Sequence, residues 1–387
     1  MKYLALNNIA KAGLDVFPKT YEAVTDIQDA DAVILRSYNM LDMEMPEKLW
    51  AIGRSGAGTN NIPVEECAKR GIVVFNTPGA NANGVKELVI LGLILAARDA
   101  KGGMKWVEDN KSDENINKTM EKAKSQFAGT EIKGKVLGVI GLGAIGVLVA
   151  NNAIDLGMKV IGYDPFLSVG SALHLNPAVS VVTNVDELYA ASDYITIHVP
   201  MNDNTKGMLN GEAMEKMKDG VAILNFARDG LVCDKCLAKY MASGKVRKYV
   251  TDLPNYTTAN LDNVIAFPHL GASTEESETN CAIMAAEELT DFLENGNITN
   301  SVNFPSMSLG VLQKPMRICV AHLNVPNVIS AMTTILGASN ANISDMVSKS
   351  RGDYAYAIFD LDHKLEEKAM EEIKKVQGVI RVRVIEK

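Results

Sequence analysis

The sequence lacks any long hydrophobic run. Its longest apolar stretches, such as Leu88 to Ala97, extend for about ten residues, whereas a helix that spans a bilayer needs about 20. Met1-Lys2-Tyr3 leads directly into strand-like sequence, without the apolar block of a signal peptide. We therefore expect a cytoplasmic protein with no membrane partner.

Cysteine is scarce, and basic residues are not in excess. Five cysteines lie scattered in the chain, an odd number that fits a reducing compartment better than a disulfide scaffold. Cys233 and Cys236 match CxxC, but no second pair or nearby histidine completes a zinc set. We expect no metal site and interpret these two cysteines as incidental thiols at a helix start. With Lys+Arg 39 against Asp+Glu 47, the net charge of −8 argues against a nucleic-acid partner.

What the sequence does contain is a regular alternation of short apolar runs and amphipathic stretches. The length of 387 residues predicts two or three domains, and strand–helix alternation predicts parallel, doubly wound sheets. The segment from Trp106 to Lys133 is polar and is interpreted as a connection. The strands are expected at Lys2–Leu6, Ala32–Arg36, Gly71–Phe75, Val136–Ile140, Lys159–Tyr163, Tyr194–Val199 and Val221–Phe226.

The C-terminal part has a different pattern. A long helix is expected from Glu275 to Asn295, ending at Gly296. Residues 306–315 contain Pro, Ser and Gly without periodicity and are interpreted as a linker. Residues 316–387 then read as strand, helix, two strands, helix and strand, which is the ferredoxin-like βαββαβ order.

The strongest local motif is a glycine-rich turn. Gly141-Leu142-Gly143-Ala144-Ile145-Gly146 directly follows the strand Val136–Ile140 and opens a helix, which is the context that a dinucleotide-binding GxGxxG requires. The next strand ends at Asp164, whose carboxylate suits a ribose 2′-hydroxyl and repels a 2′-phosphate. The motif therefore predicts NAD rather than NADP.

Two further residues suit oxidation of a 2-hydroxy acid. Arg228 follows an apolar strand, and its guanidinium can hold a carboxylate and polarise the adjacent carbonyl. His269 can exchange the hydroxyl proton near neutral pH, although a lone histidine is more often structural. Arg54 precedes the small residues Ser55-Gly56-Ala57-Gly58; this loop suits a carboxylate or phosphate, or is a plain glycine-rich turn.

With these motifs in place, the chain resembles the D-isomer-specific 2-hydroxyacid dehydrogenases that carry a C-terminal ACT domain. The resemblance covers nearly the whole chain. It rests on residues 52–61, Asn76-Thr77-Pro78-Gly79-Ala80-Asn81, the GLGAIG turn with Tyr163-Asp164-Pro165, His198-Val199-Pro200, Asn225-Phe226-Ala227-Arg228, Pro268-His269-Leu270-Gly271 and Ser301-Val302-Asn303-Phe304-Pro305.

The resemblance implies two Rossmann- or flavodoxin-like parallel-sheet domains and a ferredoxin-like ACT domain. The substrate-binding domain would comprise residues 1–98 and 284–305, the NAD-binding domain 99–283, the linker 306–315 and the ACT domain 316–387. Arg228 and His269 would be catalytic. Substrate-binding residues would be Arg54, Ser55, Gly56, Ala57, Gly58 and Asn81; cofactor-binding residues would be Thr77, Gly141, Gly143, Ala144, Ile145, Gly146, Asp164, Pro165, Val199, Pro200, Thr205, Phe226, Ala227, Asp252 and Gly271.

Two departures from the family pattern bear on the chemistry. Family members usually place a glutamate a few residues after the position of Asp252 to orient the histidine, but no Glu occurs between Glu215 and Glu275. Another carboxylate or a water must serve, or His269 works unassisted. Asp229 also stands where a glycine commonly follows the arginine, and its carboxylate could compete for the Arg228 fork.

The resemblance implies NAD-dependent oxidation of 3-phospho-D-glycerate to 3-phosphohydroxypyruvate in a homodimer or homotetramer. Two alternatives remain at this point: a dehydrogenase of another D-2-hydroxy acid, and a catalytically dead NAD-sensing protein. In the ACT domain, His322, Asn324 and Asn342 would bind L-serine as effector, unless all three are plain turn residues. Asn327 stands where the family loop usually has glycine.

Overall fold

A computed structural model describes residues 1–387, which divide into two compact units. The first unit contains Met1–Asn81 and Glu275–Lys387, and the second contains Ala82–Thr274. The division differs from the expected domain boundaries at 98 and 283. The reason for the first difference is helix α3 (Ala82–Ala97), which buries Val89 and Leu93 in the core of the second unit.

The N-terminal part of the first unit is a five-stranded parallel sheet in the order β2-β1-β3-β4-β5. Its central strand β3 is buried throughout and the neighbouring β4 is buried except at Arg54, as expected for a sheet covered on both faces. The long helix α12 (Glu275–Asn295) has the predicted bounds and packs on β4 and β5. The elements are β1 (Lys2–Leu6), α1 (Lys11–Leu14), β2 (Glu22–Val24), β3 (Ala32–Leu35), β4 (Ala51–Arg54), α2 (Val64–Lys69) and β5 (Val73–Asn76).

The second unit is built on a seven-stranded parallel sheet in the order β12-β11-β10-β9-β6-β7-β8. The order reverses beside β6, where doubly wound sheets bind their ligands. Across the two parallel sheets, the strands β2, β4, β8, β11 and β12 were not predicted from the sequence. The elements are β6 (Val136–Ile140), α6 (Ala144–Asp155), β7 (Lys159–Tyr163), α7 (Val169–His174), β8 (Ser180–Val182), α8 (Val185–Ala191), β9 (Tyr194–Ile197), α9 (Gly211–Lys216), β10 (Val221–Asn225), α10 (Asp234–Ala242), β11 (Val246–Thr251), α11 (Tyr256–Ala259) and β12 (Val264–Ala266).

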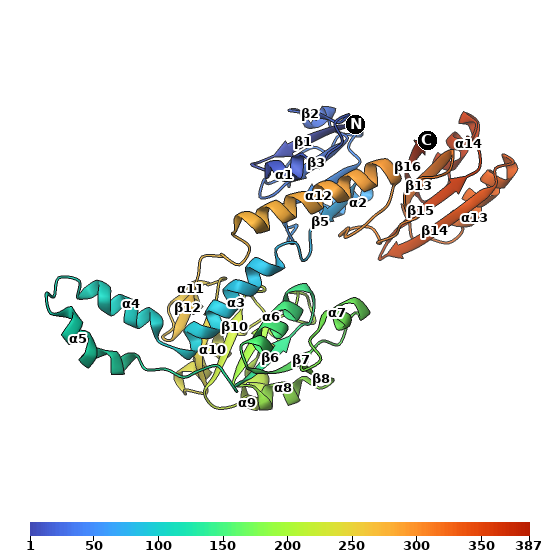
Figure 1. Cartoon of the computed structure of the whole chain (residues 1–387). Coiled ribbons are helices and arrows are strands. Elements are labelled where there is room, and N and C mark those ends of the chain that lie inside the picture. The colour runs from blue at the N-terminus through green and yellow to red at the C-terminus, as the bar shows by residue number, and fades with distance from the viewer. The chain divides into compact units, whose positions relative to one another are not determined.

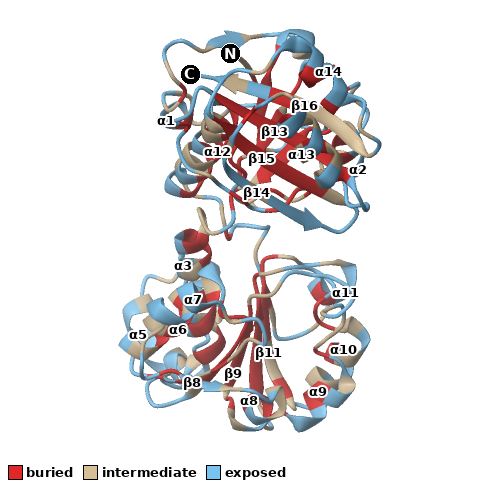
Figure 2. Ribbon diagram, turned by 90° about the vertical axis from the view of Figure 1, so that its right-hand side faces the viewer, coloured by how far each residue is buried: buried red, intermediate tan, exposed pale blue.

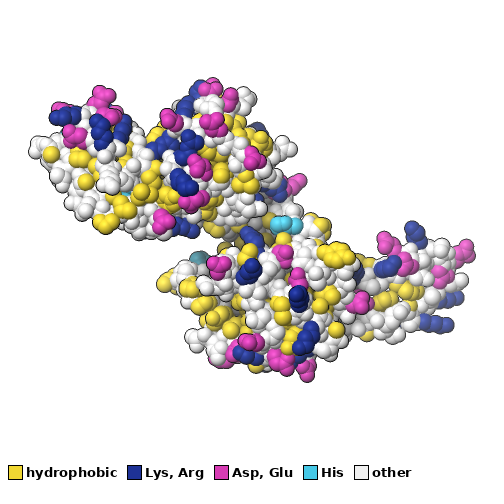
Figure 3. Space-filling model, turned by 180° about the vertical axis from the view of Figure 1, so that it is seen from behind, with side chains coloured by type: hydrophobic (Ala, Val, Ile, Leu, Met, Phe, Trp, Pro, Cys, Tyr) yellow, Lys and Arg dark blue, Asp and Glu magenta, His cyan; other side chains and the backbone are white.

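Two helices occupy much of the segment that was interpreted only as a connection. Helices α4 (Ala100–Asp109) and α5 (Ile116–Ala123) bury none of their residues. In Figure 1 they extend away from the sheet of their own unit. Met104, Val107 and Met120 are exposed on them, and Figure 3 shows hydrophobic side chains among the charges of this arm. No helix of the structure is both long and apolar enough to cross a bilayer.

The C-terminal part of the first unit has the predicted βαββαβ order and forms an antiparallel sheet, β14-β15-β13-β16. Figure 2 shows β13 and β15 buried in its centre and β14 exposed at its edge. The elements are β13 (Met316–Leu323), α13 (Val328–Ala338), β14 (Ile343–Arg351), β15 (Tyr354–Leu361), α14 (Glu367–Lys374) and β16 (Val379–Glu386).

The C-terminal sheet shares a hydrophobic core with the N-terminal sheet. Tyr356 and Ile358 of β15 belong to the same buried cluster as Phe75 of β5 and Phe292 of α12. The fully buried Arg317 side chain adds a polar clamp. Its guanidinium binds both carboxylate oxygens of Asp360, at 2.6 and 2.8 Å, and donates to the carbonyls of Asn295 and Gly310. The segment expected as a linker is therefore tied down at Gly310.

One carboxylate inside the first unit makes stability depend on pH. Glu288 on α12 is 7% exposed and accepts a hydrogen bond from Asn300 Nδ2 at 2.7 Å. Burial raises its pKa to about 8, above the value of an unfolded chain. The native state therefore holds a proton that the unfolded state releases, so Glu288 lowers stability progressively as the pH rises from about 4.5 to about 8.

We expect Glu288→Gln to become more stable relative to wild type as the pH rises from 5 to 9, because Gln stays neutral and keeps the acceptor for Asn300. Urea denaturation midpoints at pH 5, 7 and 9 measure this difference. Glu287→Gln, on the exposed neighbour, is the control and should follow wild type. A constant difference between Glu288→Gln and wild type across this range would contradict the assignment.

Candidate active site and cofactor site

Parallel pairing places the loops that follow β6, β7, β9, β10, β11 and β12 at one edge of the second unit's sheet. Ligands of doubly wound sheets bind outside these carboxyl ends. The loops at this edge carry most of the residues predicted from the sequence. The first unit and its C-terminal sheet carry the others.

The glycine turn has the geometry that each glycine was expected to provide. Gly141 has φ +89° and donates to the carbonyl of Tyr163 at 2.8 Å; an added Cβ would lie 2.6 Å from the His198 carbonyl oxygen. A Cβ on Gly146 would collide with the carbonyl oxygen of Gly141, so this glycine permits close helix–strand packing. A Cβ on Gly143 would point into open space, where a pyrophosphate can approach the start of α6. Ala144 and Ile145 form the first turn of that helix.

Asp164 lies directly beside this turn. Its Oδ2 accepts from the amide of Leu142 and its Oδ1 from the amide of Phe166, both at 2.8 Å. A carboxylate oxygen accepts two hydrogen bonds, so each still has a lone pair for a ribose hydroxyl. Pro165 follows it in the loop, and Phe166 is exposed.

The loop after β9 is internally ordered. Thr205 Oγ1 donates to the carbonyl of Pro200 at 2.6 Å and closes the turn that follows Val199. His198, just before it, shares a 3.0 Å hydrogen bond with Thr196, and burial lowers its pKa to about 3. His198 is therefore neutral at physiological pH and takes no part as a charged group.

Arg228 follows β10 on a braced loop. Asn225 at the strand end is buried; its side chain accepts from the amide of Ala227 and donates to the carbonyl of Arg228. Phe226 is buried against the core. The Arg228 side chain is exposed, with Nη1 bonded to the carbonyl of Ala227 at 2.7 Å. The backbone is thus fixed while the guanidinium faces solvent.

Asp252 and His269 meet at the ends of β11 and β12. The His269 amide donates to the Asp252 carbonyl, and the Gly271 amide donates to Asp252 Oδ2, both at 2.8 Å. His269 has a left-handed backbone, φ +51°, and is exposed. Burial raises the pKa of Asp252, opposed by the Gly271 hydrogen bond and by the charges of His269 and Arg228. Arg228 and His269 therefore both lie close enough to influence the Asp252 carboxyl group.

The structure answers the concern about Asp229. Its Oδ1 accepts from the amide of Gly230 at 2.9 Å and from Asn255 Nδ2 at 3.3 Å. The Asp229 carboxylate is therefore bound by Asn255 and not by the Arg228 guanidinium. The same Nδ2 also donates to Asp234 Oδ2 at 2.8 Å. Sequence reasoning missed Asn255, although its position ahead of Thr258 in a helix-capping pattern was a usable signal.

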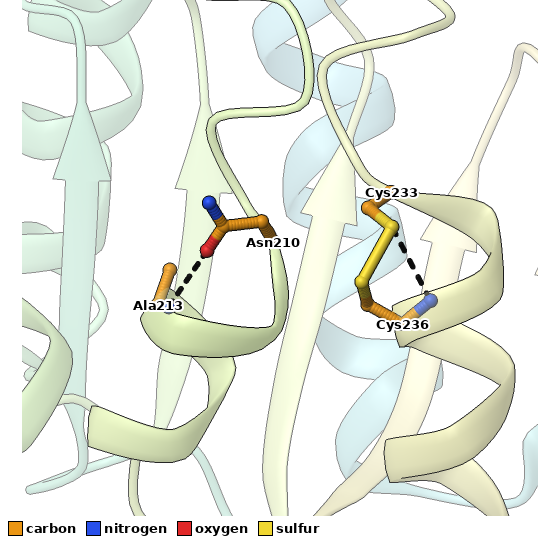
Figure 4. Close-up of a disulfide and its surroundings, with 4 residues drawn as sticks. All are labelled: Asn210, Ala213, Cys233 and Cys236. Atoms are coloured by element: carbon orange, nitrogen blue, oxygen red, sulfur yellow. Dashed lines mark hydrogen bonds between the residues drawn. A yellow bond between two sulfur atoms is a disulfide. The ribbon is translucent and has the colours of Figure 1, made fainter.

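The two cysteines that were interpreted as incidental thiols are joined in a disulfide, so that interpretation is wrong. Figure 4 shows them at the start of α10. Cys233 is the helix N-cap and Cys236 lies in the first turn, which brings their Cα atoms to 5.3 Å, within the range that disulfides span. The expected helix start is confirmed.

The remaining substrate and cofactor candidates lie in the first unit. Arg54 ends β4 and is half-buried. The Gly56 amide donates to Thr77 Oγ1 at 2.7 Å, and the fully buried Thr77 returns a bond to the Gly56 carbonyl. Thr77 thus holds the loop that contains Ser55, Ala57 and Gly58, while Asn81 is half-buried at the end of the unit.

Within one chain, the effector candidate Asn342 lies far from the other two, His322 and Asn324. Asn324 follows β13 and donates to the carbonyl of Gly352 at 3.0 Å. Asn342 precedes β14, whose first residue pairs with Leu361 opposite Met316, at the other end of β13. At about 3.4 Å per residue, the eight residues of β13 separate the two amides by roughly 20–25 Å. His322 is buried with Nε2 unpartnered; Asn327 has φ +70°, a conformation that Asn tolerates well.

Comparison with known proteins agrees with this geometry. Residues 91–271 match the family described as D-isomer specific 2-hydroxyacid dehydrogenase, NAD binding domain. The D-3-phosphoglycerate dehydrogenase of Escherichia coli K12 is 32% identical over 375 residues, covering 93% of this chain and 88% of that protein. The chain belongs to the D-isomer specific 2-hydroxyacid dehydrogenases.

Other members of this family resemble the chain over shorter spans. The D-3-phosphoglycerate dehydrogenase of Archaeoglobus fulgidus is 35% identical over 317 residues, 78% of this chain but 58% of that protein. The crystal structure of NAD+-bound 3-phosphoglycerate dehydrogenase of Entamoeba histolytica is 30% identical, with a TM-score of 0.62, over 78% of this chain and 98% of that one. The chain thus spans little more than half the length of the archaeal relatives.

NAD is the cofactor of this dehydrogenase domain, and the residues present fit it. Asp252 Oδ1 is buried and has no hydrogen-bond partner, an unsatisfied acceptor that an amide N–H of the nicotinamide would complete. The open space beyond Gly143 would admit the pyrophosphate, and Asp164 would accept from the ribose. These three points follow the path that a dinucleotide takes along such an edge.

We expect Gly143→Ala to fold normally but to bind NAD at least tenfold more weakly, because its Cβ projects where the pyrophosphate would approach. Isothermal titration gives the affinity and thermal melting the stability. Gly337→Ala, on α13 with equally open space at its Cβ, is the control and should bind NAD normally. Unchanged NAD affinity in Gly143→Ala would place the cofactor elsewhere.

Proposed function

We propose that this protein oxidises 3-phospho-D-glycerate with NAD to 3-phosphohydroxypyruvate, the first step of L-serine formation. The observation that carries the proposal is that Asp252, at the carboxyl edge of the sheet, is bonded to the backbone of His269 and is influenced by the charges of His269 and Arg228. An arginine fork, an imidazole and an acceptor for the nicotinamide amide are the groups that oxidation of a 2-hydroxy acid needs.

Each group has one task in this scheme. Arg228 binds the substrate carboxylate through its fork and holds the hydroxyl-bearing carbon in place. His269 takes the hydroxyl proton, while bound NAD supplies the hydride acceptor. Asp252 accepts from the nicotinamide amide and fixes the backbone of His269 and Gly271. The same family resemblance assigns the phosphate of the substrate to Arg54 and the Ser55–Gly58 backbone.

We expect the wild-type protein to form NADH with 3-phospho-D-glycerate at a higher kcat/KM than with D-lactate, D-glycerate or D-2-hydroxyglutarate. The absorbance of NADH at varied substrate concentration measures this.

His269→Ala should lower kcat about 10²–10⁴-fold, and Arg228→Lys should lower kcat/KM severely because an ammonium lacks the planar fork. Lys206→Ala, which changes an exposed side chain, is the control and should keep the kcat and kcat/KM of the wild type. NAD binding without turnover of any acid would instead favour an NAD sensor. A higher kcat/KM for an unphosphorylated acid would show that this acid, and not 3-phospho-D-glycerate, is the substrate.

We further propose that L-serine regulates the protein through a homo-oligomer in which the C-terminal sheets pair. Strand β14 is the exposed edge of that sheet, and exposed edges are templates for pairing. Antiparallel pairing of two β14 strands centred on Val347 would set residue 342 of one copy beside residue 352 of the other. Asn324 already contacts Gly352, so Asn324 of one copy and Asn342 of the other would share one ligand.

We expect millimolar L-serine, but not D-serine, to lower activity, and Asn324→Ala or Asn342→Ala to abolish the effect without changing uninhibited turnover. Subunits of the two variants, mixed and reassembled, should recover part of the inhibition, because one of the two sites in a mixed pair keeps both amides. Steady-state rates with and without serine measure this. Inhibition that survives in both single variants would contradict the site.

A further inference from the structure

The disulfide between Cys233 and Cys236 lies where reagents in solution can reach it. Both cysteines are half-buried, whereas Cys67, Cys281 and Cys319 are buried and unpaired. Cys233 caps α10, and its sulfur accepts from the amide of Cys236 at 3.3 Å (Figure 4). The partial positive charge of a helix N-terminus stabilises a thiolate, which is the form of cysteine that attacks disulfides.

A short chain of hydrogen bonds leads from this pair to the arginine loop. Asp234, between the two cysteines, accepts from Asn255 Nδ2 at 2.8 Å. The other hydrogen of the same amide reaches Asp229 at 3.3 Å, and Asp229 is the neighbour of Arg228. The amide thereby links the start of α10 to the Arg228 loop, and it is itself fixed by the capping box of α11.

We propose that Cys233 and Cys236 form a reversible thiol–disulfide centre that exchanges with dithiol proteins or small dithiols and adjusts the Arg228 loop. In the reduction, a thiolate of the external dithiol attacks one sulfur and the Cys233–Cys236 bond breaks. The second external thiol then releases the mixed disulfide. Two electrons and two protons pass to the cysteines, and the dithiol becomes a disulfide. Oxidation is the reverse exchange with an external disulfide.

The structural consequence follows from the position of Asp234. With the disulfide formed, the backbone on both sides of Asp234 is held, and so is its bond to Asn255. Reduction frees Cys233 and Cys236 to move apart and loosens the link to Asp229. The adjustment of substrate binding, though not the redox centre itself, rests on the function proposed for Arg228.

The redox centre is tested on the full-length protein equilibrated with mixtures of oxidised and reduced dithiothreitol, followed by acid quenching, alkylation and mass spectrometry. We expect the peptide that contains Cys233 and Cys236 to pass through one two-electron transition while the other three cysteines stay reduced. Cys236→Ser should abolish the transition, and Cys67→Ser should leave it intact. Two free thiols at every ratio, including fully oxidised dithiothreitol and diamide, would overturn the proposal.

The coupling is tested first without turnover, by hydrogen exchange in both redox states. We expect reduction to raise exchange at least threefold at residues 228–233, and Asn255→Ala to remove this difference while the redox transition persists. Equal exchange in the two states of the wild type would overturn the coupling.

A second measurement compares KM for 3-phospho-D-glycerate. We expect at least a threefold higher KM in the reduced enzyme and no redox dependence in Cys236→Ser. Turnover with a KM independent of redox state would overturn the effect on substrate binding. Failure of the proposed function gives a different result: no turnover of any hydroxy acid in either state, with the thiol transition and the exchange difference still present.

Discussion

The parallel pairing of seven strands is the constraint on which the site depends. Because every strand of the second unit runs in the same direction, the loops after them open at a single edge, and residues far apart in the sequence become neighbours. Asp252 illustrates the result: a buried carboxyl group at the end of β11 is influenced by charges from the loops after β10 and β12. The register of β10 on β11 and of β11 on β12 therefore fixes the geometry of the chemistry.

The sequence predicts those parts whose signal is local. The GxGxxG turn, the strand before it and the helix Glu275–Asn295 could be read from adjacent residues, and the structure places them with the expected bounds. Helices α4 and α5 were missed although Met104 and Val107 give an apolar pair at helical spacing, because the segment is polar overall and neither helix buries a residue. The bond from Asn255 to Asp229 joins positions 26 residues apart and depends on the fold of two loops. No pattern along the chain reports such a contact.

The carboxylates around the arginine loop show how one amide can organise several acids. The family glutamate is missing, yet Asp229 and Asp234 lie close to Arg228 in sequence. Both share Asn255, whose two N–H groups satisfy one oxygen on each carboxylate. The guanidinium consequently bonds neither carboxylate, although its Nη1 donates to the Ala227 carbonyl, and the backbone around Asp252 rather than a glutamate sets the position of His269.

The buried Arg317 clamp has a consequence for how such enzymes can be rebuilt. A terminal domain joined only by a tether can be removed or exchanged between homologues without harm. Here the β13–β16 sheet shares the cluster of Phe75, Phe292 and Phe304 with the first sheet, and Arg317 closes on the end of α12. Cutting the chain after Pro315 would uncover those aromatic rings to water and invite aggregation. A chimera that exchanges this sheet must therefore also exchange the residues of the first sheet and of α12 that pack against it, as when a subunit interface is grafted.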